Sequence, residues 1–233
     1  MTIARHIRDY QPPDMAVDVV RSAKIALLAG LSGSGIHTIK RGLLEDDGFA
    51  EIISYTTRRP REVGGVVERD GREYHFVSED VMIDMLRDEA FVEAKLVNGV
   101  AYGTSIEGVG QAATQGVAIA DIDVTGVEEY KAMSDQVVAI FIISPTYDEW
   151  MRRLKRRYKT NEDFLHEWPK RREHAIKELT RALEVPYYHF VINDDLERAI
   201  AVTAEIAARP DIFTRKDDEA RLAARDLLRQ ITM

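Results

Sequence analysis

The sequence predicts an α/β fold with a parallel five-stranded sheet flanked by helices. Short apolar runs alternate along the chain with amphipathic stretches, an order that is typical of strands joined by crossover helices. The run at 24–30 is almost wholly apolar and ends in glycine, as expected of a strand that is buried on both faces. A glycine-rich turn at 30–35 follows it directly and leads into a predicted helix.

The remaining elements follow from the same patterns. We expect the other strands at 51–55, 116–124, 137–143 and 188–192, and helices at 38–44, 147–157, 167–182, 194–208 and 211–233.

Residues 56–110 break this alternation. Three pairs of residues in the stretch are strong turn signals, namely Gly64-Gly65, Asp70-Gly71 and Asn98-Gly99. They predict a small, partly antiparallel insertion.

The length of 233 residues fits one domain of the larger kind, or a core with an inserted subdomain. We expect this domain at 24–208, with an N-terminal extension at 1–23 and a C-terminal helical extension at 209–233. The formal net charge is −8, from 32 Lys and Arg against 40 Asp and Glu, which argues against a general nucleic-acid binder. The chain has no cysteine, which excludes disulfides, thiolate zinc sites and a cysteine nucleophile.

The N-terminal residues lack the apolar core of a signal peptide. No apolar run approaches the ~20 residues that span a bilayer. We therefore expect a cytoplasmic protein with neither a nucleic acid nor a membrane as partner. The sequence carries no sign of the oligomeric state.

The glycine-rich turn lies where a phosphate-binding P-loop would lie, between a strand and a helix. Gly30 and Gly35 have the P-loop spacing, and the backbone N–H groups of such a loop can hold phosphate oxygens. The motif then requires Lys followed by Ser or Thr, whereas this chain has Ile36 and His37. A plain glycine-rich turn is the alternative interpretation.

A replacement for the missing lysine charge has two nearby candidates. Lys40 and Arg41 follow one helical turn after the loop. We expect both side chains to point away from the loop, which would leave the charge unreplaced.

An ordered set of polar motifs follows the loop. It consists of Ser54-Tyr-Thr-Thr-Arg58-Arg-Pro-Arg61, Tyr74-His-Phe76, Phe91-Val-Glu93, Tyr102-Gly-Thr104 and Asp121-Ile-Asp123-Val-Thr-Gly126. Two arginines three residues apart can converge on a monophosphate dianion, because each guanidinium donates two parallel hydrogen bonds. The tyrosine hydroxyls of Tyr74 and Tyr102 would add donors.

Carboxylates in the same set fit a purine base and a metal ion. Guanine offers N1–H and N2–H donors on one edge, and Glu93 together with Asp123 would accept them. Asp121 lies at a strand end, where a carboxylate could organise Mg²⁺ directly or through water. Each side chain alone could instead be a surface or packing residue, but the order and spacing of the set favour a site.

These motifs, with Asn193-Asp-Asp195-Leu-Glu-Arg198 near the end, resemble the guanylate kinase family from about residue 24 to residue 208. The resemblance implies a P-loop NTPase-type sheet, a GMP-binding subdomain inserted at 56–110 and a helical lid at 153–172. It assigns the GMP phosphate to Ser54, Arg58, Arg61, Tyr74 and Tyr102, and the base to Glu93, Thr104 and Asp123. It assigns ATP to Gly30, Ser32, Gly33, Ser34, Gly35, Thr38 and Asn193, with Mg²⁺ near Asp121.

A basic run at 152–159 contains six Lys or Arg residues and no acid. Alone, such a run indicates a solvated helix face or a nucleic-acid patch. Its place in the chain is similar to that of the mobile guanylate kinase lid, whose arginines close over the transferring phosphate. The resemblance therefore implies catalytic roles for Arg153, Arg157 and Arg171. The segment between Lys159 and Pro169 departs from the usual family sequence.

Three functional hypotheses follow. The first is an enzyme that phosphorylates GMP or dGMP with ATP and Mg²⁺, slowly because Ile36 replaces the P-loop lysine. The second is a guanylate-kinase-like binding module without catalysis. The third is a kinase of another nucleoside monophosphate.

Overall fold

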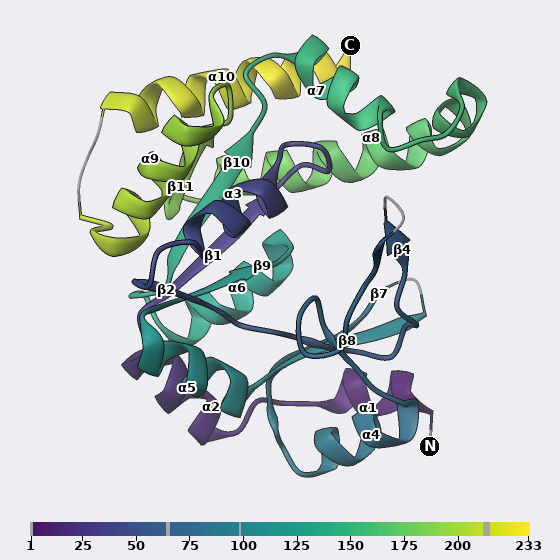
Figure 1. The fold of residues 1–233 in the computed structure, drawn as a ribbon, viewed down its shortest axis with the longest axis vertical. Helices are drawn as coiled ribbons and strands as arrows, with labels where there is room; N and C mark the ends of the chain where they lie inside the picture. The colour runs from purple at the N-terminus through teal and green to yellow at the C-terminus, as the bar shows by residue number, and fades with distance from the viewer. Residues whose placement is uncertain (1, 64–65, 98, 212–214) are drawn as a thin grey trace. The chain divides into compact units, whose positions relative to one another are not determined.

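The computed structural model describes residues 2–63, 66–97, 99–211 and 215–233 (Figure 1). The chain divides into two compact units. The first unit comprises Met1–Ile25, Asp47–Ala120 and Glu129–Val137, and the second comprises Ala26–Asp46, Asp121–Glu128 and Val138–Met233. The turn signals at Gly64-Gly65 and at Asn98 lie outside the described residues.

A five-stranded parallel sheet with the strand order β11-β10-β1-β9-β2 confirms the predicted fold class. Its strands are β1 (Ile25–Gly30), β2 (Phe49–Glu51), β9 (Val117–Asp121), β10 (Val138–Ile143) and β11 (Tyr188–Ile192). Every residue of β10 is buried, and so are the first five residues of β1. This complete burial explains why both strands read as continuous apolar runs.

The predicted strand at 51–55 is wrong, because the chain changes sheets within it. The strand β2 ends at Glu51 and pairs with β9, whereas β3 (Tyr55–Thr56) belongs to a second, smaller sheet. Ile52 still donates its N–H to a β9 carbonyl at 2.8 Å, and the Ser54 carbonyl already accepts a bond from the second sheet at 2.9 Å. The sequence stays apolar through this change of sheets, so the apolar pattern alone does not indicate it.

Two other predicted boundaries also move. The predicted strand at 116–124 ends early, at Asp121, and α6 (Val124–Met133) begins three residues later. Asp123 explains the break, because its Oδ1 accepts the Gly126 N–H at 2.7 Å, at the first turn of α6. The helix predicted at 38–44 is α3, which begins earlier, at Ile36, and ends at Leu43.

The first unit contains the second sheet, with the order β6-β3-β8-β7. Its further strands are β6 (His75–Phe76), β7 (Phe91–Val97) and β8 (Val100–Ser105). Antiparallel pairing of β8 with β3 and β7 confirms the antiparallel character predicted for this region. A separate two-stranded ribbon joins β4 (Glu62–Val63) to β5 (Val66–Val67).

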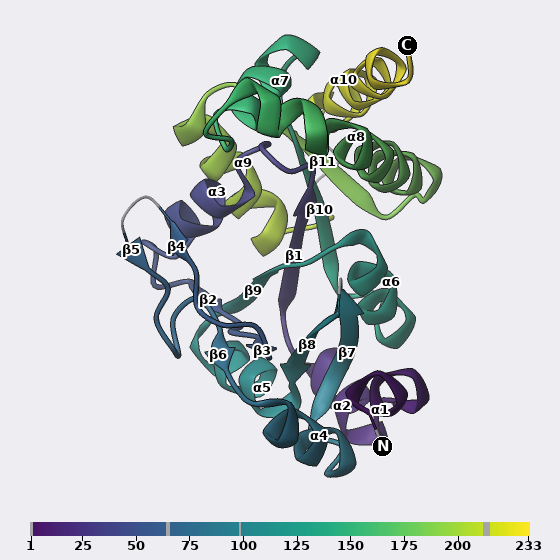
Figure 2. The ribbon, with the colours of Figure 1, turned by 90° about the vertical axis from the view of Figure 1, so that its right-hand side faces the viewer.

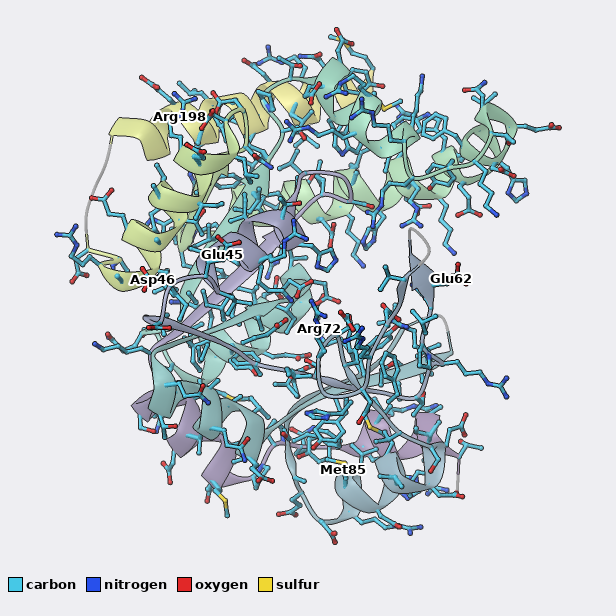
Figure 3. All side chains as sticks on the ribbon, in the orientation of Figure 1. Glu45, Asp46, Glu62, Arg72, Met85 and Arg198 are labelled. Atoms are coloured by element: carbon cyan, nitrogen blue, oxygen red, sulfur yellow. The ribbon has the colours of Figure 1, made fainter. Side chains whose placement is uncertain are left out.

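The N-terminal segment is packed into the first unit. Its helices α1 (Ile3–Asp9) and α2 (Asp14–Ser22) contact α4 (Glu79–Arg87) and α5 (Ile106–Gln115), respectively (Figure 1). Ile3 shares a buried cluster with Met82 and Phe91, and Met85 of α4 packs against this cluster (Figure 3). The Tyr10 hydroxyl donates to Phe91 O at 2.6 Å and accepts from Phe91 N at 3.0 Å.

The second unit contains the remaining helices, which are α7 (Tyr147–Lys155), α8 (Asn161–Glu184), α9 (Leu196–Ala208) and α10 (Arg215–Thr232). Helix α10 lies beside α8 and contacts β11 (Figure 2). Arg221 of α10 donates to Tyr188 O at 3.0 Å, and Arg172 of α8 donates to Ile231 O at 2.7 Å. The C-terminal segment is therefore held by side-chain bonds to main-chain carbonyls.

Helix α8 begins six residues before the predicted start at 167. Thr160 and Asp163 form a capping box, in which each side chain accepts the other residue's backbone N–H. Phe164 is buried in the first turns, and Pro169 is accommodated inside the helix. The capping box and the buried Phe164 thus set the start of α8 at Asn161. Within the described parts of the chain, no helix is long and apolar enough to cross a membrane.

Candidate functional site

The loop between β1 and α3 has a backbone that requires glycine. Gly30, Gly33 and Gly35 have φ values of +152°, +94° and +95°. A Cβ atom on Gly30 would lie 2.3 Å from Ile142 O, and one on Gly35 would lie 2.2 Å from the Asn193 amide nitrogen. The glycines therefore let the loop pack tightly at the N-terminus of α3, where helix N–H groups favour an anion.

Side chains of the second unit hold this loop in place. Asn193, which is buried, donates from Nδ2 to Ser34 O at 2.7 Å. Trp150 donates from Nε1 to Ser32 O at 3.0 Å, and Arg157 donates from Nη1 to Ser32 Oγ at 2.6 Å. Asn193 and Ser34, both predicted to bind ATP, are thus bonded to each other, and Ser32, predicted with them, is bonded to a predicted lid arginine.

A cluster of charged side chains lies beside the loop at the end of β9. Lys40 of α3 donates a short hydrogen bond from Nζ to Asp121 Oδ1. His37 Nδ1 lies 3.3 Å from Asp121 Oδ2. Burial alone would raise the pKa of Asp121, but the charges of Lys40 and His37 and the Lys40 hydrogen bond outweigh burial and hold the pKa below its ordinary value. The carboxylate therefore stays ionised.

This cluster corrects the expectation that Lys40 points away from the loop. A helical side chain tilts toward the helix N-terminus, so a residue in the second turn can reach the first. His37 belongs to that first turn, and the Lys40 ammonium binds the same carboxylate.

The cluster also limits how Asp121 could hold a metal ion. One of its oxygens is bonded to Lys40 and the other lies 3.3 Å from His37 Nδ1. The described residues contain no group of three or more His, Cys, Asp or Glu side chains that could hold a metal. Mg²⁺ keeps several waters and takes phosphate oxygens as ligands. A contact between Asp121 and Mg²⁺ therefore stays a prediction.

The three predicted lid arginines have different partners. Arg153 donates from Nε to Glu149 Oε1 at 2.6 Å, and Arg171 donates from Nε to the Tyr158 hydroxyl at 3.1 Å. Arg157 alone of these three bonds to the glycine-rich loop. Hydrogen bonds from Arg152 and Arg153 lower the pKa of Glu149 to about 2. Glu149 was missed in the sequence analysis, although its (i, i+4) spacing to Arg153 could have signalled the pair.

The predicted base-reading residues of the first unit meet on one face of the β7–β8 pair. The register places Glu93 opposite Thr104. Thr104 Oγ1 donates to Glu93 Oε1 at 2.7 Å, and Ser54 Oγ lies 3.0 Å from Thr104 Oγ1. Glu93 is only 5% exposed, so its carboxylate depends on these polar neighbours. Asp123, predicted to act with Glu93, belongs to the second unit.

Lys95 is a neighbour of Glu93 that the sequence analysis missed. The register places Lys95 opposite Tyr102, and directly opposite residues of an antiparallel pair share a face. Lys95 Nζ lies 3.5 Å from Glu93 Oε2 and 3.8 Å from Glu129 Oε2. The period of two along β7 from Glu93 could have indicated it.

The predicted phosphate clamp centres on Arg58. Its guanidinium carbon lies 4.8 Å from the Tyr74 ring centroid and 5.4 Å from that of Phe76. The Tyr74 and Tyr102 rings stand edge to face, with centroids 5.9 Å apart. The structure therefore brings Arg58, Tyr74 and Tyr102 together, whereas the Arg61 side chain is exposed.

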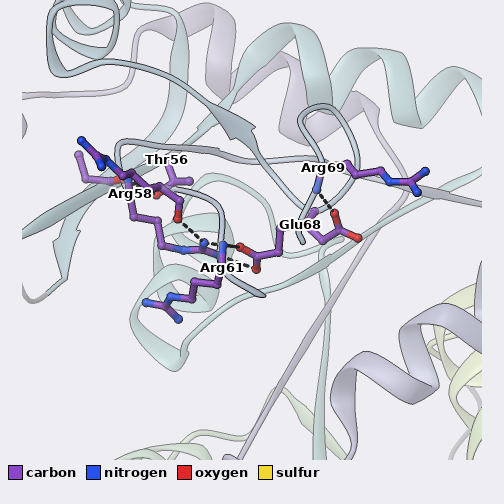
Figure 4. Close-up of polar contacts among 8 residues, drawn as sticks. Thr56, Arg58, Arg61, Glu68 and Arg69 are labelled. Atoms are coloured by element: carbon purple, nitrogen blue, oxygen red, sulfur yellow. Dashed lines mark hydrogen bonds and ion pairs between the residues drawn. The ribbon is translucent and has the colours of Figure 1, made fainter. Parts of the chain in front are cut away.

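Glu68 is the partner of Arg58, and the sequence analysis missed it (Figure 4). Arg58 Nη2 donates to Glu68 Oε1 at 2.8 Å, Nη1 donates to Oε2, and Arg61 N donates to Oε2 at 2.8 Å. The β4–β5 register pairs Glu62 with Val67, so Arg61 and Glu68 are adjacent. A hairpin register centred on the Gly64-Gly65 turn signal would have found this pair.

Comparisons with known proteins agree on one family. A sequence model described as "Guanylate kinase" matches residues 22–209. The guanylate kinase of Neisseria gonorrhoeae is 35% identical over 181 residues, covering 77% of this chain and 84% of that protein. The guanylate kinase of Oleidesulfovibrio alaskensis is 36% identical over 203 residues, covering 82% and 94%. The crystal structure of guanylate kinase from Anaplasma phagocytophilum shares the fold, with a TM-score of 0.60 at 24% identity over 82% of this chain and 88% of that one.

Proposed function

This chain belongs to the guanylate kinase family, and we propose that it transfers the γ-phosphoryl group of ATP to GMP or dGMP, giving ADP and GDP or dGDP. Membership makes it a nucleotide-binding phosphotransferase. The choice of GMP as substrate rests on the Glu93 carboxylate. It is buried and accepts a hydrogen bond from Thr104, on the same face of the β7–β8 pair as Tyr102.

The base edge is the most specific part of the proposed site. A carboxylate accepts the N1–H and N2–H donors of guanine, and adenine lacks that pair of donors. A site built from hydrogen bonds rejects a ligand that leaves its polar groups unpaired. The Thr104 bond fixes the orientation of the Glu93 carboxylate, so Glu93 presents its acceptors in one geometry.

Arg58 is the residue best placed to hold the monophosphate. It lies among the rings of Tyr74 and Phe76, and the fork pair with Glu68 fixes its guanidinium plane. The Tyr74 and Tyr102 hydroxyls would add donors to the phosphate oxygens. Ser54 would contribute its hydroxyl from the same sheet, because it is already bonded to Thr104.

The ATP phosphates would lie against the loop from Gly30 to Gly35 and the N-terminus of α3. A GMP phosphate oxygen forms a new bond to the γ-phosphorus while the bond from that phosphorus to the bridging oxygen of ADP breaks. Such transfer depends on positioning and charge neutralisation rather than on covalent chemistry from the protein. Mg²⁺ bound to ATP would neutralise phosphate charge. Arg157, already bonded to Ser32 of the loop, would add positive charge from the lid.

A specific observation favours one alternative, a binding module without catalysis. Ile36 and His37 stand where the P-loop motif has Lys and Ser or Thr. A coupled assay of ADP release with purified protein, MgATP and a panel of monophosphates separates these functions. ADP release that depends on GMP or dGMP supports the kinase, and preference for another monophosphate moves the assignment to that substrate. Heat of GMP binding in a calorimeter without any ADP release supports the binding module.

A further inference from the structure

Ile36 leaves the loop without the cation that a P-loop places on the ATP phosphates. Two basic side chains follow on α3, and they differ in their surroundings. Arg41 is exposed, whereas the Lys40 side chain is only 14% exposed. Lys40 also stands four residues after Ile36, and residues four apart share one face of a helix.

Lys40 shares one carboxylate with the first turn of α3. Its Nζ binds Asp121 Oδ1, and Asp121 Oδ2 lies 3.3 Å from Nδ1 of His37, which is the second residue of the helix. The Lys40 side chain is therefore directed toward the N-terminal part of α3, where Ile36 begins the helix. Asp121 ends β9, and the Ile122 N–H that follows it donates to Leu28 O of β1 at 3.0 Å. The carboxylate that holds the ammonium is thus tied through the next residue of the chain to β1, the strand that leads into the loop.

We propose that Lys40 is the phosphate-binding cation that stands in for the missing P-loop lysine, with Asp121 as its positioning residue. The inference rests on the proposed kinase function and assigns the residue that would supply positive charge to the ATP phosphates. A lysine ammonium acts on phosphate as a compact point charge and does not need a bidentate geometry. A bond to Asp121 therefore orients the charge without preventing its action on a phosphate at the helix N-terminus.

The competing interpretation is that Lys40 and Asp121 form only a structural link between α3 and β9. Such a link would affect folding stability and both substrates alike. A phosphate-binding role instead predicts a loss confined to ATP. It also predicts that a lysine restored at position 36 takes over the function of Lys40, because either residue then supplies the same charge.

The test compares Lys40→Met, Ile36→Lys and the double variant, with Arg41→Met as the matched control on the same helix. Steady-state assays give kcat and KM for each substrate, calorimetry gives ATP binding, and thermal melts report folding. We expect Lys40→Met to lower kcat/KM for ATP by roughly 10- to 100-fold with little change in KM for GMP. We expect Ile36→Lys to recover most of this loss in the double variant, and to add less in the wild-type background. Arg41→Met should behave as wild type.

Each remaining outcome decides the question. A kcat/KM for ATP within twofold of wild type in Lys40→Met overturns the proposal. A loss that affects ATP and GMP equally, and that Ile36→Lys does not recover, assigns Lys40 a structural role and also overturns it. A wild-type protein that releases no ADP with any monophosphate rejects the kinase function. Weaker ATP binding in a folded Lys40→Met variant would then still support Lys40 as the phosphate-binding cation.

Discussion

Arg58 and Glu68 form a fork pair in which two nitrogens of the guanidinium bond to the two oxygens of one carboxylate, with 2.8 Å between Nη2 and Oε1. Their side chains are 8% and 15% exposed, so the pair is largely shielded from water. The carboxylate fixes the plane of the arginine that we assign to the GMP phosphate. Orientation of this kind reduces the side-chain entropy that binding would otherwise cost.

Arg58→Ala should weaken GMP binding by roughly 10- to 100-fold, because a charge-assisted hydrogen bond contributes about 1.5–3 kcal/mol. Calorimetric titration with GMP measures the effect. Arg59→Ala is the matched control, since Arg59 is adjacent and exposed. If both variants bind GMP as the wild type does, or if the wild type gives no heat at millimolar GMP, the phosphate assignment is wrong.

Glu93→Gln should reduce the preference for GMP over AMP by roughly tenfold or more. A glutamine offers one acceptor and one donor, so it cannot accept both the N1–H and N2–H of guanine. The ratio of kcat/KM for the two monophosphates is the measurement, and Glu107→Gln on the exposed face of α5 is the control. An unchanged ratio would place base recognition elsewhere.

Arg157→Ala should lower kcat by at least roughly tenfold while leaving KM for GMP nearly unchanged. The reason is that Arg157 reaches Ser32 of the loop, so its charge is directed to the ATP side. Arg156→Ala provides an exposed neighbour as control. Equal rates for the two variants would remove Arg157 from the transfer step.

The Glu68 carboxyl should make stability depend on pH in acid. The hydrogen bond from Arg58 lowers the pKa of Glu68 and outweighs the opposing effect of burial. Since the folded pKa is below the unfolded value of about 4.3, the stabilisation is present above that value and is lost as pH falls through the folded pKa. Urea unfolding from pH 6 to 3 should show the difference between wild type and Glu68→Gln shrinking. A constant difference would mean that ionisation of Glu68 does not contribute.

The sequence was sufficient where burial is uniform and insufficient where a partner decides the structure. The fully buried strand β10 was predicted almost to the residue, because nothing interrupts its apolar run. The change of sheets after Glu51 left no polar mark. The cap at Thr160 and the buried Phe164 start α8 six residues before the predicted start at 167. Burial and sheet membership leave different traces in the sequence. The periodicity of apolar residues indicates burial, whereas the sheet to which a strand belongs depends on strands that are distant in the chain.

The candidate site follows the same division. Glu93, Thr104 and Tyr102 were predicted from their order along the chain and from the family resemblance, and the structure places them on one face of the β7–β8 pair. Glu68 required a hairpin register, and Lys40 required attention to the direction in which helical side chains tilt. Residue type and order therefore nominated candidate site residues, but they did not predict which pairs hold those residues in place.

Tyr10 lies outside the residues 22–209 that match the family, yet its hydroxyl holds both main-chain polar groups of Phe91, two residues before Glu93. The boundary of the homologous segment is therefore not a boundary of cooperative folding. An excised fragment that begins at residue 22 would lose these two hydrogen bonds to β7, the strand that carries Glu93, which we propose reads the base. The N-terminal segment therefore takes part in the packing that supports β7 and, through it, the position of Glu93.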